Sequence, residues 1–313
     1  TLSSSSAASD VYKRQSLSIA FYSGRVRGRS FMKFLLNGIV LAIILLVLTI
    51  LSLFIGVSKV SITDIFHLTE SQMNIIVSSR IPRTVSIIIS GSTLALAGLI
   101  MQQMMQNKFV SPTTAGTMEW AKLGILLSMI FFPQENIIIK LIFAVVLSIA
   151  GTFLFVKLVQ YIRFTDVIFI PLLGIMLGGI VSSFATFIAL RTNTVQSIGN
   201  WLNGNFAIIT SGRYEILYLS IPLLILTYIF ANHFTIAGMG KDFSNNLGVN
   251  YEKIINIGLF ITATITALVV VTVGTLPFLG LIVPNIVSIF RGDHLKNALL
   301  HTAMLGSIFV MFS

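Results

Sequence analysis

Long uninterrupted apolar runs recur along most of the chain. An α-helix rises ~1.5 Å per residue, so about 20 apolar residues are enough to cross a bilayer core of ~30 Å. Of the 313 residues, 55% are hydrophobic and only 10% are charged, whereas a soluble domain carries about 25% charged residues. These proportions exclude a soluble globular enzyme and a disordered chain. A transmembrane barrel would show short alternating segments instead, so the runs predict an all-α polytopic membrane protein.

The predicted membrane segments follow one another with no hydrophilic domain between them. They cover residues 34–57, 82–105, 115–132, 136–162, 167–190, 214–231, 253–273 and 276–290, and a last segment begins near Asn297. We expect residues 1–33 to form an N-terminal flank that is partly non-native, because residues 3–15 resemble a translated sequencing adapter. The last segment stops at Ser313 inside an apolar run. We therefore expect residues 34–313 to form one transmembrane domain that is truncated at its C-terminal end.

The net charge of the chain is +10. In a membrane protein, such an excess is typical of cytoplasmic flanks, which are rich in Lys and Arg, so nucleic acid is not a predicted partner. The distribution of basic residues places the N-terminus inside, although most of this bias comes from the flank 1–33. The chain has no cysteine, and its histidines lie far apart, so we predict no disulfide, metal site or cofactor.

Two arginines, Arg80 and Arg83, open the second predicted segment on either side of Pro82. Proline suits a helix start, where its missing N–H costs nothing. The arginines lie one turn apart and should face the outer surface. They either anchor the helix at the membrane interface or dock acidic groups of an extracytoplasmic partner, and the residues alone leave both interpretations open.

The second predicted segment closes with the amides Gln102 and Gln103. Amides at membrane depth face other helices or a wet cavity, so packing and pathway lining both remain open. In the next segment, Glu119 and Lys122 have the spacing of an ion pair on one helix face. The predicted segments hold no further acid at mid-helix, which argues against a carrier driven by protons or sodium.

Residues 233–251 form the longest polar connection after the flank. Gly238, Gly240 and Gly248 punctuate it, and Lys241 and Asp242 could start a short helix. The connection is either a solvated linker or a cytoplasmic helix that docks onto another protein.

Glycine and proline interrupt the apolar pattern again at Gly274, Pro277, Gly280 and Pro284. A broken helix persists in a membrane only where protein or water satisfies the freed backbone groups. Such breaks mark transport paths in many carriers, and a purely structural kink is the alternative.

Three blocks of sequence resemble the permease subunits of type II ABC importers, the FecCD-like family that imports iron–siderophore, haem and cobalamin. The first is Arg80-Ile-Pro-Arg83 with the small residues that follow it, and the second is the loop around Met239-Gly240 and Leu247-Gly248. The third and most specific is Phe278-Leu-Gly-Leu-Ile-Val-Pro-Asn285, followed by Arg291-Gly-Asp-His294. The run 104–116 is similar to the branch for catecholate-type ferric siderophores. The segment 118–122 departs from the family, which usually has Gly, Ser and Asn there.

The resemblance implies a permease fold with ten helices per subunit, of which about nine segments are present here. It implies a multi-pass subunit in the cytoplasmic (inner) membrane of a bacterium that imports ferric siderophores. Its partners would be a cytoplasmic ABC ATPase dimer, an extracytoplasmic siderophore-binding protein and a second permease subunit. The chain has no phosphate-binding loop, so it is not expected to be an enzyme, and ATP hydrolysis would occur on the ATPase.

The resemblance also assigns roles to particular residues. Arg80 and Arg83 would dock the binding protein. The ATPase coupling loop would consist of Met239, Gly240, Lys241, Asp242, Leu247 and Gly248. The translocation pathway or its helix break would include Gln102, Gln103, Gly274, Gly280, Pro284 and Asn285.

Other functions compete with this prediction. Haem or cobalamin could be the cargo within the same family. A secondary carrier driven by an ion gradient would need intramembrane acids and no ATPase-docking loop. A membrane-embedded enzyme would need clustered histidines or acids, and the sequence has no such cluster.

Overall fold

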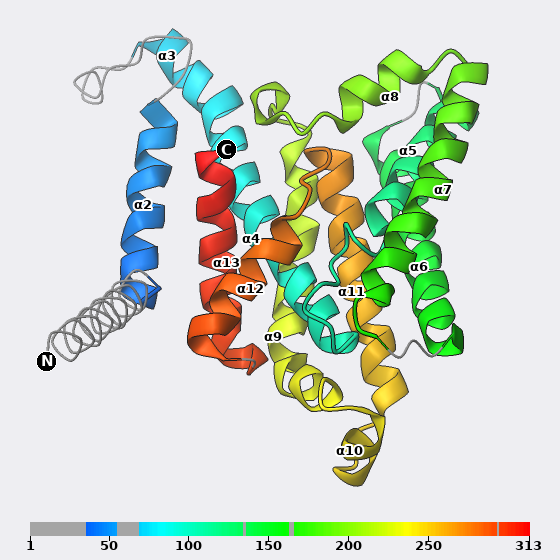
Figure 1. Ribbon diagram of the computed structural model, residues 1–313. Helices are drawn as coiled ribbons and strands as arrows, with labels where there is room; N and C mark the ends of the chain where they lie inside the picture. The colour runs from blue at the N-terminus through cyan, green and yellow to red at the C-terminus, as the bar shows by residue number, and fades with distance from the viewer. Residues whose placement is uncertain (1–35, 55–68, 134–135, 163–165, 293) are drawn as a thin grey trace, which may run out of the picture.

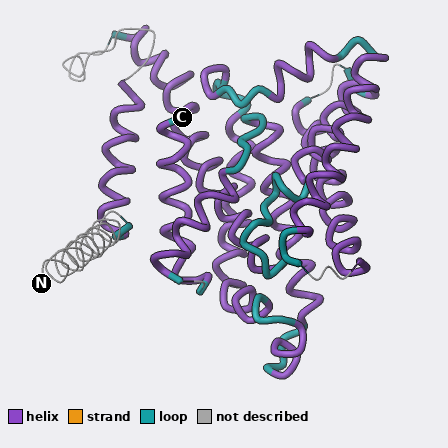
Figure 2. Tube along the Cα trace, viewed as in Figure 1, coloured by secondary structure: helices purple, strands orange, loops and turns teal. Residues whose placement is uncertain are grey.

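The computed structural model describes residues 36–54, 69–133, 136–162, 166–292 and 294–313. All regular elements in these ranges are helical (Figures 1 and 2), which confirms the all-α class. The predicted flank 1–33 lies outside the described residues. The long helices stand side by side in a bundle, with α3 and α8 at one end and α10 at the opposite end (Figure 1).

The bundle is built from long and short helical elements. In chain order they are α2 (Gly38–Phe54), α3 (Glu70–Ile75), the π-helix η2 (Ile76–Arg80), α4 (Ile81–Met104), α5 (Thr117–Phe131), α6 (Ile137–Ile162), α7 (Phe169–Arg191), α8 (Val195–Leu202), the 3₁₀ helices η3 (Phe206–Ile208) and η4 (Tyr214–Leu219), α9 (Ser220–Ala237), α10 (Lys241–Asn246), α11 (Tyr251–Thr272), α12 (Leu279–Arg291) and α13 (Leu295–Phe312). Six helical stretches of the described chain are long and apolar enough to cross a membrane, and α2 and α12 are shorter apolar helices.

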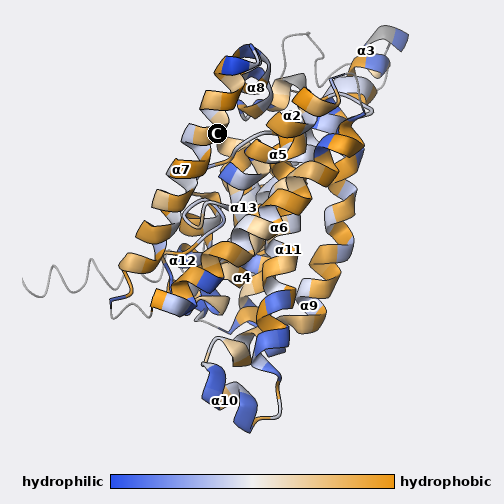
Figure 3. Ribbon diagram, turned by 90° about the vertical axis from the view of Figure 1, so that its right-hand side faces the viewer, coloured by the Kyte–Doolittle hydropathy of each residue, from blue (hydrophilic) through white to orange (hydrophobic). Residues whose placement is uncertain are grey.

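Helices α4 and α11 form the centre of the bundle. Of their apolar spans, 78% is buried, against 28% for α6 and 22% for α7. Helix α13 packs along α4, and α6 packs against α5 and α11. The outer faces of the peripheral helices are apolar (Figure 3), with exposed side chains such as Ile142, Ile180 and Ile229. Lipid tails are as apolar as these side chains, so such faces are stable in a bilayer.

Helical structure around Pro82 starts earlier than predicted, because it begins at Glu70 and runs unbroken through η2 into α4. Proline inside a helix removes one hydrogen bond and leaves the carbonyl four residues earlier without its donor. Here that carbonyl belongs to Ser78, and the Ser211 N–H donates to it at 3.3 Å. In the π-turn, the Ile81 N–H bonds to the Ile76 carbonyl. This turn is wider than an α-helical turn, which makes space for the proline ring. The helix therefore passes through Pro82 instead of starting there.

Two close helix crossings depend on glycine. A Cβ on Gly98 of α4 would overlap the backbone of Gly280 in α12, and a Cβ on Gly91 would overlap Gly306 and Ser307 in α13. Small residues allow helices in membranes to approach until their backbones touch. These two contacts fix α12 and α13 against the central helix.

One further connection forms a helix. It contains Trp201, is α8, and lies across one end of the bundle (Figure 1). The sixth predicted segment ends at Ala237 instead of residue 231, because Phe234 in its last turns is fully buried and keeps the helix packed.

Candidate functional site

The two predicted docking arginines occupy different environments. Arg80 is only 5% exposed, and its Nη1 donates to the Leu53 carbonyl of α2 at 2.6 Å. The prediction that both arginines face outward is therefore wrong for Arg80, because the π-turn directs this side chain toward α2. Arg83 is half-buried; its Nε is buried without a hydrogen-bond partner in the described structure, and another part of the side chain is exposed. Arg83 is the better candidate for an external acidic partner.

A cluster of basic residues that sequence reasoning missed surrounds Trp201, at the same end of the bundle as α3 (Figure 1). The Lys140 ammonium lies 4.7 Å and the Arg213 guanidinium 4.2 Å from the centre of the Trp201 ring. The indole N–H donates to the Val271 carbonyl at 3.0 Å, which fixes the ring in place. Burial lowers the pKa of Arg213 from its ordinary value. The cluster is a second site of positive charge that could meet acidic groups from outside.

The predicted coupling loop forms α10 at the opposite end of the molecule (Figures 1 and 3). Gly240 enters it with a φ of +108° and Gly248 leaves it with a φ of +73°, values that favour glycine. The Ser244 hydroxyl is buried and donates to the Gly240 carbonyl at 2.7 Å and to the Ile236 carbonyl at 3.1 Å. Serine thus secures α10 to the end of α9.

Around α10, apolar and charged side chains separate. Met239, Phe243 and Leu247 recur every four residues and are 59%, 47% and 56% exposed, so an apolar face is open to solvent. Lys241 Nζ pairs with Glu252 Oε1 at 2.9 Å, and this hydrogen bond raises the pKa of Lys241. The ion pair is exposed, so it contributes little to stability. Asp242 lies in the first turn of α10.

Three residues predicted for the translocation pathway lie at the junction of α12 with α4 and the loop that follows α4. They are Gln102, Gly280 and Asn285. Gln102 is 7% exposed and donates to the Leu281 carbonyl at 3.4 Å. Asn285 donates to the carbonyls of Lys108 and Leu281, at 2.8 Å each. These contacts satisfy backbone groups at the helix junction.

The remaining pathway candidates lie at other breaks. Gln103 lies against Gly238, just before α10. Gly274, with a φ of +97°, follows α11 and approaches Leu202 at the end of α8. Pro284 lies inside α12. The polypeptide between Gly274 and the start of α12 is not helical.

A cavity of about 340 Å³ opens on the surface of the bundle beside α7, and two of its wall residues, Ile175 and Phe278, are more than half exposed. Its walls come from the loop after α4, the first turn of α5, the middle of α7 and the residue that precedes α12. They are Thr113, Thr114, Glu119, Ile175, Gly178, Gly179, Ser182 and Phe278. Helices α5 and α12 have only 15 and 13 residues, about 20 Å each, so each is shorter than a bilayer core.

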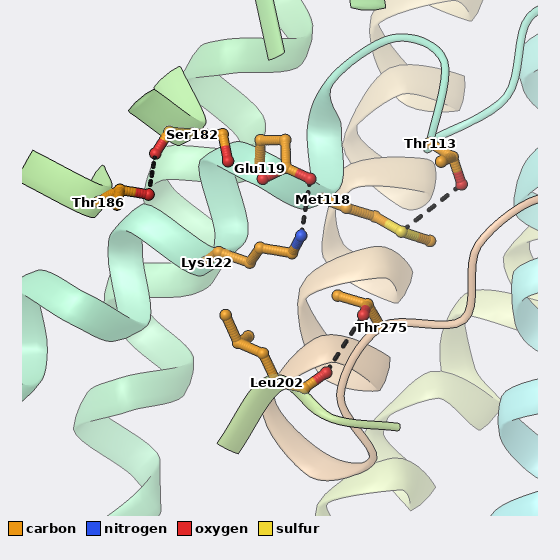
Figure 4. Close-up of polar contacts among 8 residues, drawn as sticks. All are labelled: Thr113, Met118, Glu119, Lys122, Ser182, Thr186, Leu202 and Thr275. Atoms are coloured by element: carbon orange, nitrogen blue, oxygen red, sulfur yellow. Dashed lines mark hydrogen bonds and ion pairs between the residues drawn. The ribbon is translucent and has the colours of Figure 1, made fainter. Parts of the chain in front are cut away.

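Two wall residues have unusual surroundings. Glu119 Oε1 pairs with Lys122 Nζ at 2.7 Å (Figure 4), which confirms the predicted ion pair. Phe278 has a φ of +61°, a conformation that is strained for a bulky residue and costs about 1–3 kcal/mol. Thr113 and Thr114 lie in the run after α4, and Phe278 opens the third block that resembles the family. The sequence does not place Phe278 in a cavity wall, because its placement depends on its backbone conformation.

The fold and these sites define a multi-pass helical transport permease with an open cavity beside α7 and an exposed helix at one end. No group of three or more metal-ligating side chains occurs among the described residues. The chain belongs to the FecCD transport family, whose model matches residues 19–313. This family consists of transport permeases, not enzymes.

Several relatives agree with this family. The chain is 54% identical over 272 residues to the petrobactin import system permease protein YclN of Bacillus subtilis (strain 168), covering 87% of this chain and 86% of that protein. It is 39% identical to the petrobactin import system permease protein FatD of Bacillus anthracis, over 86% of this chain and 78% of that protein. It is 37% identical to the ferric-anguibactin transport system permease protein FatD of Vibrio anguillarum, over 83% of each chain.

A solved structure has the same fold. The inward-facing conformation of a metal-chelate type ABC transporter superposes with a TM-score of 0.74 and 21% identity, covering 87% of each chain. At this identity the similarity concerns the fold alone.

Proposed function

We propose that the chain is the membrane-spanning permease subunit of an ATP-driven importer of ferric siderophores. The observation that carries the proposal is the 54% identity to a petrobactin import permease over 87% of the chain. The cavity among α5, α7 and Phe278 supports it, because its mostly apolar wall with a few polar groups is suited to a chelate that has both apolar and polar parts. The subunit resides in the bacterial cytoplasmic membrane, with α10 on the cytoplasmic side.

The ATPase dimer binds at α10 in this proposal. Met239, Phe243 and Leu247 expose apolar surface at the end of the bundle, outside the long helices (Figure 3). Such side chains can fill a cleft in a partner, while Gly240, Lys241, Asp242 and Gly248 shape the helix and its connections. ATP-driven closure of the dimer then displaces α10 and shifts the population of permease states.

The siderophore-binding protein docks at the opposite end. Arg83 and the cluster of Lys140 and Arg213 supply positive charge there. Arg80 binds the Leu53 carbonyl of α2 and so holds the helix that carries Arg83 in place. Charge complementarity accelerates such docking and sets its orientation. A second permease subunit covers the exposed apolar face of α7, which includes Ile180 and lies beside the cavity.

The proposal is tested by reconstituting the chain with its ATPase and binding protein in vesicles. Radioactive iron is supplied as a ferric catecholate chelate on the side of the binding protein. It should accumulate on the side of the ATPase, and only when ATP is present on that side. The matched control is an ATPase whose phosphate-binding lysine is replaced. Uptake that follows an ion gradient without ATP would contradict the proposal. Uptake of haem or cobalamin in place of the chelate would show that the proposed cargo is wrong.

A further inference from the structure

The cavity has only one acidic side chain in its wall, Glu119. Its Oε1 accepts from Lys122, and its Oε2 accepts no hydrogen bond within the described part of the chain. The carboxylate and the lysine are each about one quarter exposed, at 25% and 23%. A carboxylate oxygen is therefore presented to the cavity, while the lysine holds the other oxygen.

The rest of the wall is suited to the same ligand chemistry. Thr113 and Ser182 provide hydroxyl groups, and Gly178 and Gly179 leave the wall of α7 without side chains in front of Glu119. A Cβ on Gly178 would lie 3.4 Å from Cγ of Glu119, so this part of α7 lies in direct contact with the Glu119 side chain. Figure 4 shows Glu119 between Ser182 and Lys122, with Thr113 across the loop.

The presence of the charged pair Glu119–Lys122 in a membrane bundle also requires an explanation. A lone ion at bilayer depth costs about 2.5–3.5 kcal/mol or more, and such groups mark functional sites by default. The pair limits this cost, yet two apolar residues would often be as stable or more stable. Packing alone does not explain a carboxylate with a free oxygen in a cavity wall.

We propose that Glu119 is a specificity-determining residue that accepts a hydrogen bond from an N–H group of the transported chelate. Lys122 is a positioning residue that holds the carboxylate through Oε1. Phe278, on the opposite wall, supplies an apolar surface for the aromatic or aliphatic part of the cargo. The inference rests on the proposed function, because it names the chemistry that the import cavity selects.

The test compares two ferric chelates that differ only in an amide N–H and its N-methyl counterpart. In the reconstituted importer, wild type should prefer the N–H chelate. Glu119→Gln keeps a neutral acceptor and should lower the ratio of uptake rates several-fold. The double variant Glu119→Met/Lys122→Met removes both charges and should lower the ratio by about tenfold, toward one, because a hydrogen bond to a charged group is lost.

The controls separate a folding defect from a loss of recognition. Glu215→Gln changes a glutamate that binds the Gly212 N–H outside the cavity, and it should leave the ratio unchanged. A purely structural role would change total uptake of both chelates equally. An unchanged ratio in the double variant overturns the inference. If wild type takes up neither chelate with ATP, the proposed function itself fails.

Discussion

Arg80 and Arg83 show how one turn of helix gives identical side chains different roles. The π-turn before Pro82 directs Arg80 toward α2, where it donates to the Leu53 carbonyl. Arg83 follows the proline and keeps its Nε without a partner in the described structure. Burial makes the first arginine structural, and partial exposure leaves the second available to a partner.

Substitutions should separate the two roles. Arg80→Ala removes a charge-assisted hydrogen bond of about 1.5–3 kcal/mol, so it should lower the melting temperature of the purified protein in detergent. Arg83→Ala should leave melting nearly unchanged. It should weaken binding of the siderophore-binding protein at low salt by up to about fivefold, since exposed ion pairs contribute about 0.2–1 kcal/mol.

The matched control is Arg191→Ala, which removes an exposed arginine at the end of α7, where its guanidinium lies over the Phe187 ring. It should change neither measurement. Equal loss of stability in the Arg80 and Arg83 variants would disprove the division of roles.

Helix α10 is the element whose sequence and structure agree most directly. Its glycines and polar composition leave a solvated linker and a short docking helix both open, and the family resemblance favours the helix. The structure has a helix there, α10, at residues 241–246. Its exposed apolar face was not predicted, because Phe243 becomes significant only when Met239 and Leu247 are seen to be exposed with it.

A charge placed on this face should disconnect the ATPase. Leu247→Glu puts a carboxylate where an apolar contact is proposed, so ATPase affinity should fall by about tenfold or more. Uptake should fall with it, as measured by co-purification and by transport in vesicles. Asn246→Glu introduces the same charge at the neighbouring exposed position and should retain both. Normal uptake in Leu247→Glu would remove α10 from the coupling mechanism.

For the whole molecule, the apolar runs predict most of the architecture. Backbone groups in lipid must be satisfied internally, so long apolar runs can only be helices here. The cavity could not be predicted, because Glu119 and Phe278 are distant in sequence and meet only through the packing of α5, α7 and α12. The interpretation of Gln102 and Asn285 stayed open for the same reason, since their carbonyl partners belong to other segments.

The glycine crossings should dominate the stability of the bundle. Gly98→Ala places a methyl group in the backbone of Gly280, and such overpacking costs about 1–3 kcal/mol. Thermal unfolding in detergent should show a lower midpoint for this variant. Gly199→Ala adds the same methyl group to α8, where nothing lies within 4 Å, and should melt like wild type or slightly higher. Equal midpoints would show that α12 can move away from α4 without cost.

The contact between Gly98 and Gly280 also has a mechanical consequence. The backbones of α4 and α12 touch at Gly98 and Gly280 with no side chain between them. No change of rotamer can therefore absorb a displacement of one helix against the other, so we expect the two helices to move as one rigid body. At the end of α4 and just after it, Gln103 lies beside Gly238 and Gln106 lies beside Gly240. A displacement of α10 would therefore act directly on this rigid body. Phe278 directly precedes α12, so it would move with the two helices. A movement that begins at the ATPase would then end by moving this wall of the cavity against Glu119.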